Sequence, residues 1–323
     1  MISHADWSKS PGKRWIAVAV LQANHSWLVC ELSKVREPSS LFLHLKSYQF
    51  TPSCIMAGFD FPIGVPISYA AKAGITDFLT TLALLGHNEW DQFYTPAELP
   101  TQISTNRPFY PNRPGNSRRH YLEQGLNIPF DQLYRLCEVA HENRGAACPL
   151  FWSMGGQQVG KAAISGWQSL LSPALDDPEL NLKIWPFSGS LADICKIGNI
   201  VVLETYPAEF YGHLGISFSF PVRRSKRNQI DRKALAHQLI SWAANHNVEL
   251  DGKIIGLVMD GFGNDLNGED RFDAFVGLYG MINVILGNHL TGEPTPPLIT
   301  KIEGWIFGQE QPQKDTRVSR ISK

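Results

Sequence analysis

The sequence predicts an α/β fold, and three observations support this. Apolar runs of strand length fill the first sixty residues, another apolar run at 198–206 follows a long intervening stretch, and two segments with helical spacing come after it. Of the 323 residues, 43% are hydrophobic and 18% are charged, which is typical of a folded globular protein and unlike a disordered chain. A chain of this length forms one elaborated domain or two.

The first sixty residues are expected to form successive strands. A short strand ends near Asp6, and others are expected at 14–22, 26–35, 41–50 and 54–61. Turn-forming residues, among them Ser10, Pro11 and Gly12, separate the strands. Connections this short predict antiparallel neighbours at the start of the chain, because parallel strands need a longer crossover.

The chain changes character after Pro66. Helix-like segments at 68–86 and 130–144 flank a stretch rich in proline, arginine and aromatic residues at 96–121. A loop that long inside a compact domain is usually functional or part of an insertion. We therefore predict a helical and loop insertion at 67–196, a core formed by 1–66 and 197–308, and a flexible polar tail at 309–323.

Strand character returns at 198–206, where four consecutive apolar residues from Ile200 to Leu203 are typical of a strand buried on both faces. A helix is expected from Asp231 onwards, and a second helix at 269–286. These elements complete the predicted α/β core.

The second of these helices carries a stripe of small residues. Asp273, Gly277 and Gly280 lie along one side of it. Because an interior glycine costs about 1 kcal/mol relative to alanine, the stripe predicts close contact with another element, and Asp273 begins that contact. Asp270 and Glu269 lie on the same side, and we interpret them as acids that complement the helix dipole.

Four acids stand beside apolar runs: Asp6, Asp60, Glu204 and Asp273. A carboxylate there is costly to bury unless it is paired, protonated or neutralised by a cation. Oxygen ligands favour magnesium or manganese, and no histidine or cysteine cluster has zinc-like spacing. The set predicts catalytic metal ligands for hydrolytic phosphoryl transfer. A structural alternative for Asp60 is to cap the turn after its strand.

Several longer motifs extend this picture. They are Gly58-Phe59-Asp60-Phe61-Pro62-Ile63-Gly64-Val65-Pro66, Trp185-Pro186-Phe187-Ser188-Gly189, Glu204-Thr205-Tyr206-Pro207-Ala208, and Asp260-Gly261-Phe262-Gly263 leading into Glu269-Asp270-Arg271-Phe272-Asp273-Ala274-Phe275. In these motifs, which span most of the chain, the sequence resembles the domain of unknown function 429 family, described as predicted nucleases of RNase H-like fold.

The resemblance implies an RNase H-like core, with a mixed five-stranded sheet whose first three strands are antiparallel and which is flanked by helices. It also implies metal binding by an aspartate on the first strand, an acid on a later strand and an acid on the final helix. These correspond to Asp6, to Asp60 or Glu204, and to Asp273. The segment around Asp6 departs from the pattern, because it lacks the glycines often found beside that aspartate.

Basic residues alternate with aromatic ones between 106 and 121. Arginine and aromatic side chains together suit single-stranded nucleic acid or a nucleotide phosphate, so we expect substrate contacts from Arg107, Arg113, Arg118 and Arg119. We add Lys161, which stands at an expected helix start where a phosphate can bind. A proline-rich loop packed on its own aromatics is an equal alternative. A second basic run at 223–227 is interpreted as a solvated loop. The net charge of −1 gives no global attraction to a phosphate backbone.

The five cysteines are odd in number and widely spaced, so reduced, buried thiols are expected rather than a disulfide framework. No signal peptide or membrane span is evident, which predicts a cytoplasmic protein without a membrane partner. Two alternatives to a nuclease stay open. One is an ATP-dependent phosphotransferase of actin or sugar-kinase architecture, with phosphate turns at 8–13 and 260–264. The other is a non-catalytic binding module. The substrate of a nuclease is left open among DNA, RNA and small nucleotides.

Overall fold

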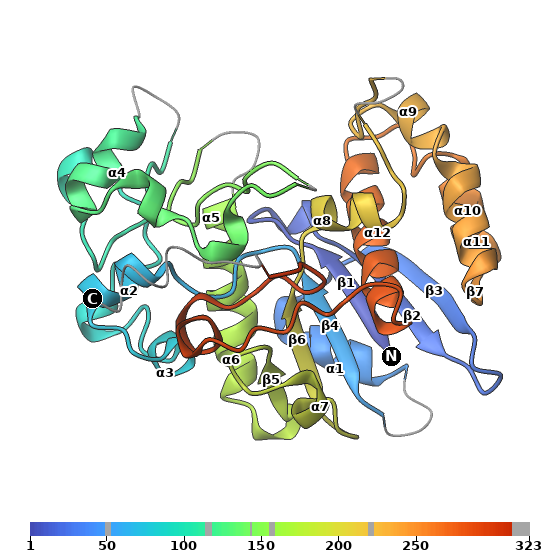
Figure 1. Ribbon diagram of the computed structural model, residues 1–323, viewed down its shortest axis with the longest axis horizontal. Coiled ribbons are helices and arrows are strands. Elements are labelled where there is room, and N and C mark those ends of the chain that lie inside the picture. Colours follow the sequence, from blue (N-terminus) through green and yellow to red (C-terminus); the bar gives the residue numbers. More distant parts are fainter. Residues whose placement is uncertain (49–52, 114–117, 143, 155–158, 219–222, 312–323) are drawn as a thin grey trace.

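The computed structural model describes residues 1–48, 53–113, 118–142, 144–154, 159–218 and 223–311. Within them the chain forms a seven-stranded mixed sheet flanked by helices, in the order β5-β6-β4-β1-β2-β3-β7 (Figure 1). The α/β prediction is therefore confirmed. In Figure 1, α2 to α5 lie beyond the β6 and β5 side of the sheet, and α9 to α11 lie on the opposite side, by β3 and β7.

The strands fall into three groups. β1 (Ile2–Asp6), β2 (Trp15–Leu21) and β3 (Trp27–Lys34) form an antiparallel meander, as the short connections predict. β4 (Ile55–Phe59) pairs in parallel with β1, and β6 (Ile200–Glu204) pairs in parallel with β4. The edge strands β5 (Leu182–Ile184) and β7 (Val248–Leu250) bring the sheet to seven strands, where the resemblance implies five. Each has three residues, too few to show an alternating pattern. β5 lies within the predicted insertion, 67–196.

Two predicted elements are wrong. Residues 41–46 form a helix instead of a strand, because Leu41, Phe42 and Leu45 have the spacing of one buried helical face. The helix expected at 130–144 is replaced by two 3₁₀ turns, Phe130–Leu133 and Leu136–Glu138. Between those turns the chain extends and directs the Arg135 side chain into the interior.

The helices are shorter than predicted except at the C-terminal end of the core. They are α1 (Leu41–Lys46), α2 (Ile67–Ala73), α3 (Phe78–Leu82), α4 (Arg119–Leu126), α5 (Val159–Gly166), α6 (Ser172–Leu175), α7 (Leu191–Ile194), α8 (Pro207–His213), α9 (Gln229–Lys233), α10 (Ala236–Asn245), α11 (Gly252–Met259) and α12 (Gly268–Ile285). None of these helices in the described ranges is long and apolar enough to cross a membrane.

Both faces of the sheet are covered. In β6, Ile200 and Val202 pack into one hydrophobic cluster while Val201 and Leu203 pack into another, so the expected burial of this strand on both faces is confirmed. The first cluster includes Trp167 and much of the segment between α2 and α6, and the second is built around α12.

The small residues of α12 allow it to lie close to the sheet, as predicted. A Cβ atom at Gly277 would lie 2.1 Å from the ring of His4 on β1, and one at Gly280 would lie 2.0 Å from Phe210 on α8. His4 Nδ1 also lies 3.1 Å from the Ala274 carbonyl oxygen. Because alternate residues of a strand face the same way, Asp6 is directed to the same side of the sheet as His4, toward the first turns of α12.

The predicted tail begins in an ordered segment. Gln309 is buried, and its carbonyl oxygen accepts a hydrogen bond from Trp305 Nε1 at 2.8 Å. Residues 312–323, which make up most of that prediction, lie outside the described residues.

Candidate functional site

An open pocket lies at the carboxyl ends of β1 and β4. Its volume is about 750 Å³, and Asp6, Asp60, Asp270 and Asp273 line it together with Glu269. The parallel pairing of β1 with β4 places Ala5 beside Phe59, so the next residues, Asp6 and Asp60, emerge side by side. Three of the four acids singled out in the sequence therefore meet in one place.

Asp6 and Asp60 are joined directly. The Asp6 carboxyl donates a hydrogen bond to the Asp60 carboxylate, and Asp60 Oδ1 also accepts a hydrogen bond from the Trp7 amide at 2.6 Å. The Asp60 carboxylate thus also binds the amide of the residue that follows β1, whereas the structural use considered for it is to cap the turn after its own strand.

The pKa values of this pair follow from burial and from crowding of like charges. Burial, then the charges of Asp60 and Asp273, raise the pKa of Asp6 well above its usual range. Burial raises the pKa of Asp60 to about 6, although the hydrogen bonds from Asp6 and the Trp7 amide oppose this. This arrangement favours one proton held between the two carboxyl groups, because two adjacent carboxylates cannot both ionise at low cost.

Asp273 is the third member of the cluster and has two partners. Its Oδ1 accepts a hydrogen bond from the Tyr211 hydroxyl at 2.9 Å, and its Oδ2 is ion-paired with Lys226 Nζ. Burial opposes the charge of Lys226, but Asp273 outweighs it and raises the pKa of this lysine. Lys226 also lies 3.4 Å from Glu269 Oε1, so one ammonium neutralises part of the acidic pocket.

Asp270 also belongs to the site, in contrast to its interpretation as a dipole-compensating acid. It lines the pocket, and its Oδ2 is buried without a hydrogen-bond partner. Burial raises the pKa of Asp270 to about 6, with further contributions from Asp273 and Glu269. The sequence signal was its i, i+3 spacing from Asp273, which places both on one side of α12.

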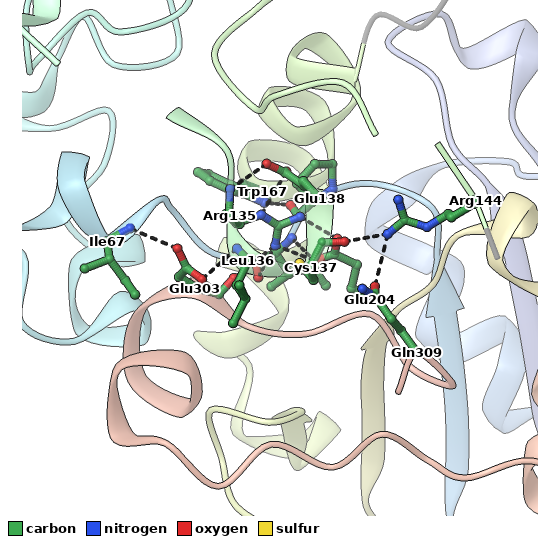
Figure 2. Close-up of polar contacts among 12 residues, drawn as sticks. Ile67, Arg135, Leu136, Cys137, Glu138, Arg144, Trp167, Glu204, Glu303 and Gln309 are labelled. Atoms are coloured by element: carbon green, nitrogen blue, oxygen red, sulfur yellow. Dashed lines mark hydrogen bonds and ion pairs between the residues drawn. The ribbon is translucent and has the colours of Figure 1, made fainter. Parts of the chain in front are cut away.

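Glu204, by contrast, does not join the cluster, and the prediction that all four carboxylates converge is wrong for this residue. Both of its oxygens are bound by the Arg135 guanidinium, at 2.6 and 2.7 Å, and Oε2 also accepts a hydrogen bond from the Ile63 amide at 2.6 Å (Figure 2). Bidentate pairing of this kind satisfies the buried carboxylate without a metal. Glu204 is a structural residue in this fold.

The Arg135 pair is part of a larger buried network. The guanidinium also binds Glu138 Oε1 at 2.9 Å and the Glu303 carbonyl oxygen at 3.0 Å. The Glu303 carboxylate accepts hydrogen bonds from the Ile67 and Leu136 amides (Figure 2). Burial raises the pKa of Glu303 to about 7. The network joins the start of α2 and the segment before it, the 3₁₀ turns, β6 and the helical turn Ile299–Glu303.

The five cations predicted to bind substrate do not line the pocket. Arg107 donates hydrogen bonds to the Thr95 and Pro96 carbonyl oxygens, at 2.9 and 3.1 Å, and so braces its own loop. Arg119 lies over the Phe130 ring, 5.2 Å from its centroid. Lys161 binds the Asn112 carbonyl oxygen at 3.0 Å. Arg113 and Arg118 are exposed, and their contact with a substrate stays a prediction.

The cations at the pocket come from two other segments. Lys9 and Lys13 follow β1, and Lys226 and Arg227 belong to the basic run at 223–227. We interpreted that run as a solvated loop, but Lys226 enters the pocket and pairs with Asp273. A run of basic residues gives no indication of which side chain turns inward. The sequence therefore indicates the basic run at 223–227 but not the role of Lys226 within it.

One of the turns expected for ATP binding is filled by the protein itself. Arg232 donates hydrogen bonds to the Gly261 and Gly263 carbonyl oxygens at 2.8 and 2.6 Å, and Arg271 donates to the Phe262 carbonyl oxygen at 3.0 Å. A phosphate cradle uses backbone amides, and the amides of residues 260–262 donate instead to carbonyl oxygens of α11, at 3.0, 2.9 and 2.7 Å. The other turn, at 8–13, contributes Ser8, Lys9, Ser10 and Lys13 to the pocket wall.

The donor atoms suit a hard cation, but their present arrangement does not form a metal site. In the described part of the chain, no group of three or more histidine, cysteine, aspartate or glutamate residues is arranged to hold a metal ion. Asp6 and Asp60 are hydrogen-bonded to each other, and Asp273 is ion-paired with Lys226, so these carboxylates already have partners other than a metal ion. Comparisons of the chain with protein-family models, curated proteins and solved structures find no match.

Proposed function

We propose that this chain is a divalent-metal-dependent phosphodiester hydrolase, a nuclease with an RNase H-like core, as its resemblance to the domain of unknown function 429 family implies. One observation carries the proposal: Asp6, Asp60 and Asp273 come from β1, the end of β4 and α12, and meet in a single open pocket. These are the places on the first strand, a later strand and the final helix from which the resemblance draws its metal ligands.

The sheet supports the proposed core. The run β3-β2-β1-β4-β6 is a mixed five-stranded unit whose first three strands are antiparallel and whose last two are parallel to β1. β5 and β7 are then additions at its edges. A fold of this kind hosts many activities, so the function rests on the site and not on the sheet.

Magnesium or manganese would be held by Asp6, Asp60 and Asp273, with Asp270 in the place expected for Glu204. When bound, such an ion activates water and stabilises charge on the leaving oxygen. The unpartnered Asp270 Oδ2 and the shared proton of Asp6 and Asp60 both mark positions where a cation would lower the energy of the site. Binding requires the loss of that proton and the displacement of Lys226 from Asp273.

The chain's own cations account for substrate binding. Lys9, Lys13 and Arg227 surround the acids, and a basic rim around an acidic floor attracts a phosphodiester while keeping the scissile phosphate near the carboxylates. Lys226 can pair with a substrate phosphate once it leaves Asp273. Single-stranded nucleic acid or a nucleotide is the proposed substrate class.

The test combines calorimetric titration of Mn²⁺ with cleavage of fluorescent single-stranded DNA, single-stranded RNA and bis(p-nitrophenyl) phosphate. D6N and D273N should each lose about 100-fold or more of the turnover and retain the circular dichroism of the wild type. D77N is the matched control, because Asp77 caps α3 away from the pocket and an asparagine oxygen can accept the same hydrogen bond from the Thr80 amide. Unchanged metal-dependent turnover in both pocket variants would remove the proposal.

A non-catalytic binding module is the second candidate, and the ion pair between Asp273 and Lys226 favours it. K226M separates the two. If Lys226 merely holds the position of a metal ion, its removal should tighten Mn²⁺ binding about tenfold, which corresponds to roughly 1.4 kcal/mol. If the acids serve only as structural partners, neither the wild type nor K226M will bind Mn²⁺ at millimolar concentrations.

A further inference from the structure

Two cysteines far apart in the sequence lie in contact at the end of β4 opposite the acidic pocket. Cys54 immediately precedes β4, and Cys195 directly follows α7. The Cys54 thiol donates a hydrogen bond to the Cys195 sulfur. Both side chains are half-buried and pack against the same hydrophobic cluster.

The backbone around the two thiols is fixed by hydrogen bonds. The Gly198 amide donates to the Ser53 carbonyl oxygen at 3.2 Å, and the Ile55 amide donates to the Asn199 carbonyl oxygen at 3.0 Å. Asn199 Nδ2 in turn donates to the Ile194 carbonyl oxygen at 2.9 Å. These hydrogen bonds hold the two backbone segments that carry the thiols side by side.

We propose that Cys54 and Cys195 form a reversible modification site, at which a peroxide oxidises the pair to a disulfide. The remaining cysteines lack such a partner among the contacts of the described chain: Cys30 donates to the Val18 carbonyl oxygen, Cys148 donates to the Trp152 carbonyl oxygen, and Cys137 is fully buried. The inference is independent of the proposed hydrolase activity.

The surroundings of the two thiols favour Cys195 as the sulfur that reacts first. The hydrogen bond from Cys54 lowers the pKa of the Cys195 thiol, with help from Lys196 and against the effect of burial. The same hydrogen bond, together with burial, raises the pKa of Cys54. Residues 196–198 beside Cys195 are exposed, so a small oxidant has access. Cys195 is the attacking thiolate, because the thiolate is the reactive form.

The reaction balances with hydrogen peroxide as the oxidant. The Cys195 thiolate attacks one peroxide oxygen, the O–O bond breaks, and the departing hydroxide takes up a proton to become water, which leaves a sulfenic acid on Cys195. The Cys54 sulfur then attacks the Cys195 sulfur, the S–O bond breaks, and the Cys54 proton leaves with the second water. Two thiols lose two electrons and two protons, and the peroxide is reduced to two waters. A dithiol reverses the step by exchange.

The disulfide would close a loop that contains the predicted insertion 67–196 except its last residue, since the cross-link joins Cys54 and Cys195. A cross-link that closes a long loop restricts the unfolded chain. The acids of the pocket lie at the opposite ends of β1 and β4 and are not touched by it. We therefore expect oxidation to raise the unfolding midpoint of the chain and to leave the pocket's Mn²⁺ affinity unchanged.

The experiment exposes the full-length chain to hydrogen peroxide, alkylates the remaining thiols and maps the peptides by mass spectrometry. The expected result is a cross-linked peptide pair containing Cys54 and Cys195, the loss of two alkylatable thiols per chain, and their recovery with dithiothreitol. In C54S, a 1,3-dione probe should trap the sulfenic acid on Cys195. In C195S, Cys54 should remain a thiol at the same peroxide dose.

Cys30 and Cys148 serve as internal controls, because both are also half-buried and burial raises the pKa of each to about 11. They should stay alkylatable when the pair is oxidised. Oxidation of Cys30 or Cys148 before Cys195, or conversion of Cys195 to a sulfinic acid without a link to Cys54, would overturn the proposal. Both outcomes are measured by mass spectrometry and do not depend on whether the protein cleaves a phosphodiester.

Discussion

Two groups of buried acids in this chain have opposite arrangements. Around Arg135, the carboxylates of Glu204, Glu138 and Glu303 each receive hydrogen bonds from a guanidinium or from backbone amides (Figure 2). In the pocket, Asp6 and Asp60 depend on each other, and one oxygen of Asp270 has no partner. The first group has enough donors for its charges and the second does not. A site with unsatisfied acids at an opening is a place to bind a cation, whereas a satisfied one holds the fold together.

The largest expected effect tests the group of acids around Arg135, which we interpret as structural. R135A leaves the buried Glu204 and Glu138 carboxylates without their cation, so the free energy of unfolding should fall by about 3 to 5 kcal/mol, as measured by urea denaturation. R113A is the control, because Arg113 is exposed and a surface substitution of this kind changes stability by about 0.5 kcal/mol or less.

A double variant shows whether the loss arises from the ion pair. R135M/E204L removes both charges of the Arg135–Glu204 pair and leaves Glu138 as the carboxylate that has lost its cation. It should therefore recover part of the stability lost in R135A, because one buried unpaired charge remains instead of two. A double variant that is less stable than R135A would mean that Glu204 stabilises the fold without the guanidinium, through the hydrogen bond that it accepts from the Ile63 amide.

A smaller effect tests how the pocket is assembled. G277A places a methyl group where the His4 ring stands, and this should cost about 1 to 3 kcal/mol through overpacking and move α12, with its Asp273, away from β1. G256A in α11 is the matched control. A Cβ atom there meets nothing within 4 Å, so this variant should gain up to about 1 kcal/mol from helix propensity.

The two outcomes of the G277A experiment separate packing from site geometry. If G277A lowers both stability and Mn²⁺ affinity while G256A lowers neither of them, the close contact between α12 and β1 positions the acids. If G277A is as stable as the wild type, the ring of His4 rearranges freely and the glycine stripe has no such role.

Local patterns in the sequence predicted the pocket better than they predicted the Arg135 network. Asp6, Asp60 and Asp273 interrupt apolar runs, and the glycines after Asp273 indicated a helix pressed against a strand. Glu204 has the same local signature as Asp60, a carboxylate at the exit of a buried strand. Only its partner distinguishes it, and Arg135 lies 69 residues away along the chain in a segment whose helix-like pattern was misleading. Pairings at such separations are set by tertiary structure and leave no local trace.

The same limit explains Lys226 and the edge strands. Lys226 stands in a run of basic residues in which one side chain enters the pocket and its neighbour Arg227 stays largely exposed, and composition does not distinguish them. β5 and β7 have three residues each and owe their extended form to pairing with β6 and β3. Their sequences alone are too short to favour a strand.

The smallest expected effect is on the pH dependence of the free energy of unfolding, and it tests the pocket acids, which lack enough hydrogen-bond donors. Burial raises the pKa of Asp270 from 3.8 to about 6, so the folded state binds this proton more tightly than the unfolded state does. Ionisation therefore costs stability, and the contribution of Asp270 to the free energy of unfolding should fall as the pH rises from about 4 to 6 and then stay level. D270N removes this titration, and it should exceed the wild type by about 1 kcal/mol at pH 7, after allowance for solvent screening, and by little at pH 4.

The measurement is urea denaturation of both proteins at several pH values between 4 and 7, with D265N as a control of opposite sign. The Asn267 amide lowers the pKa of Asp265, as does Arg271, so D265N should lose stability relative to the wild type at pH 7 and not gain it. Saturating Mn²⁺ should reverse the advantage of D270N, because a cation stabilises the ionised wild-type pocket and has one ligand fewer in the variant. A D270N advantage that is the same at pH 4 and pH 7 would show that the carboxyl of Asp270 does not carry the cost of its burial, and the contrast between the two groups of acids would then rest on Asp6 and Asp60 alone.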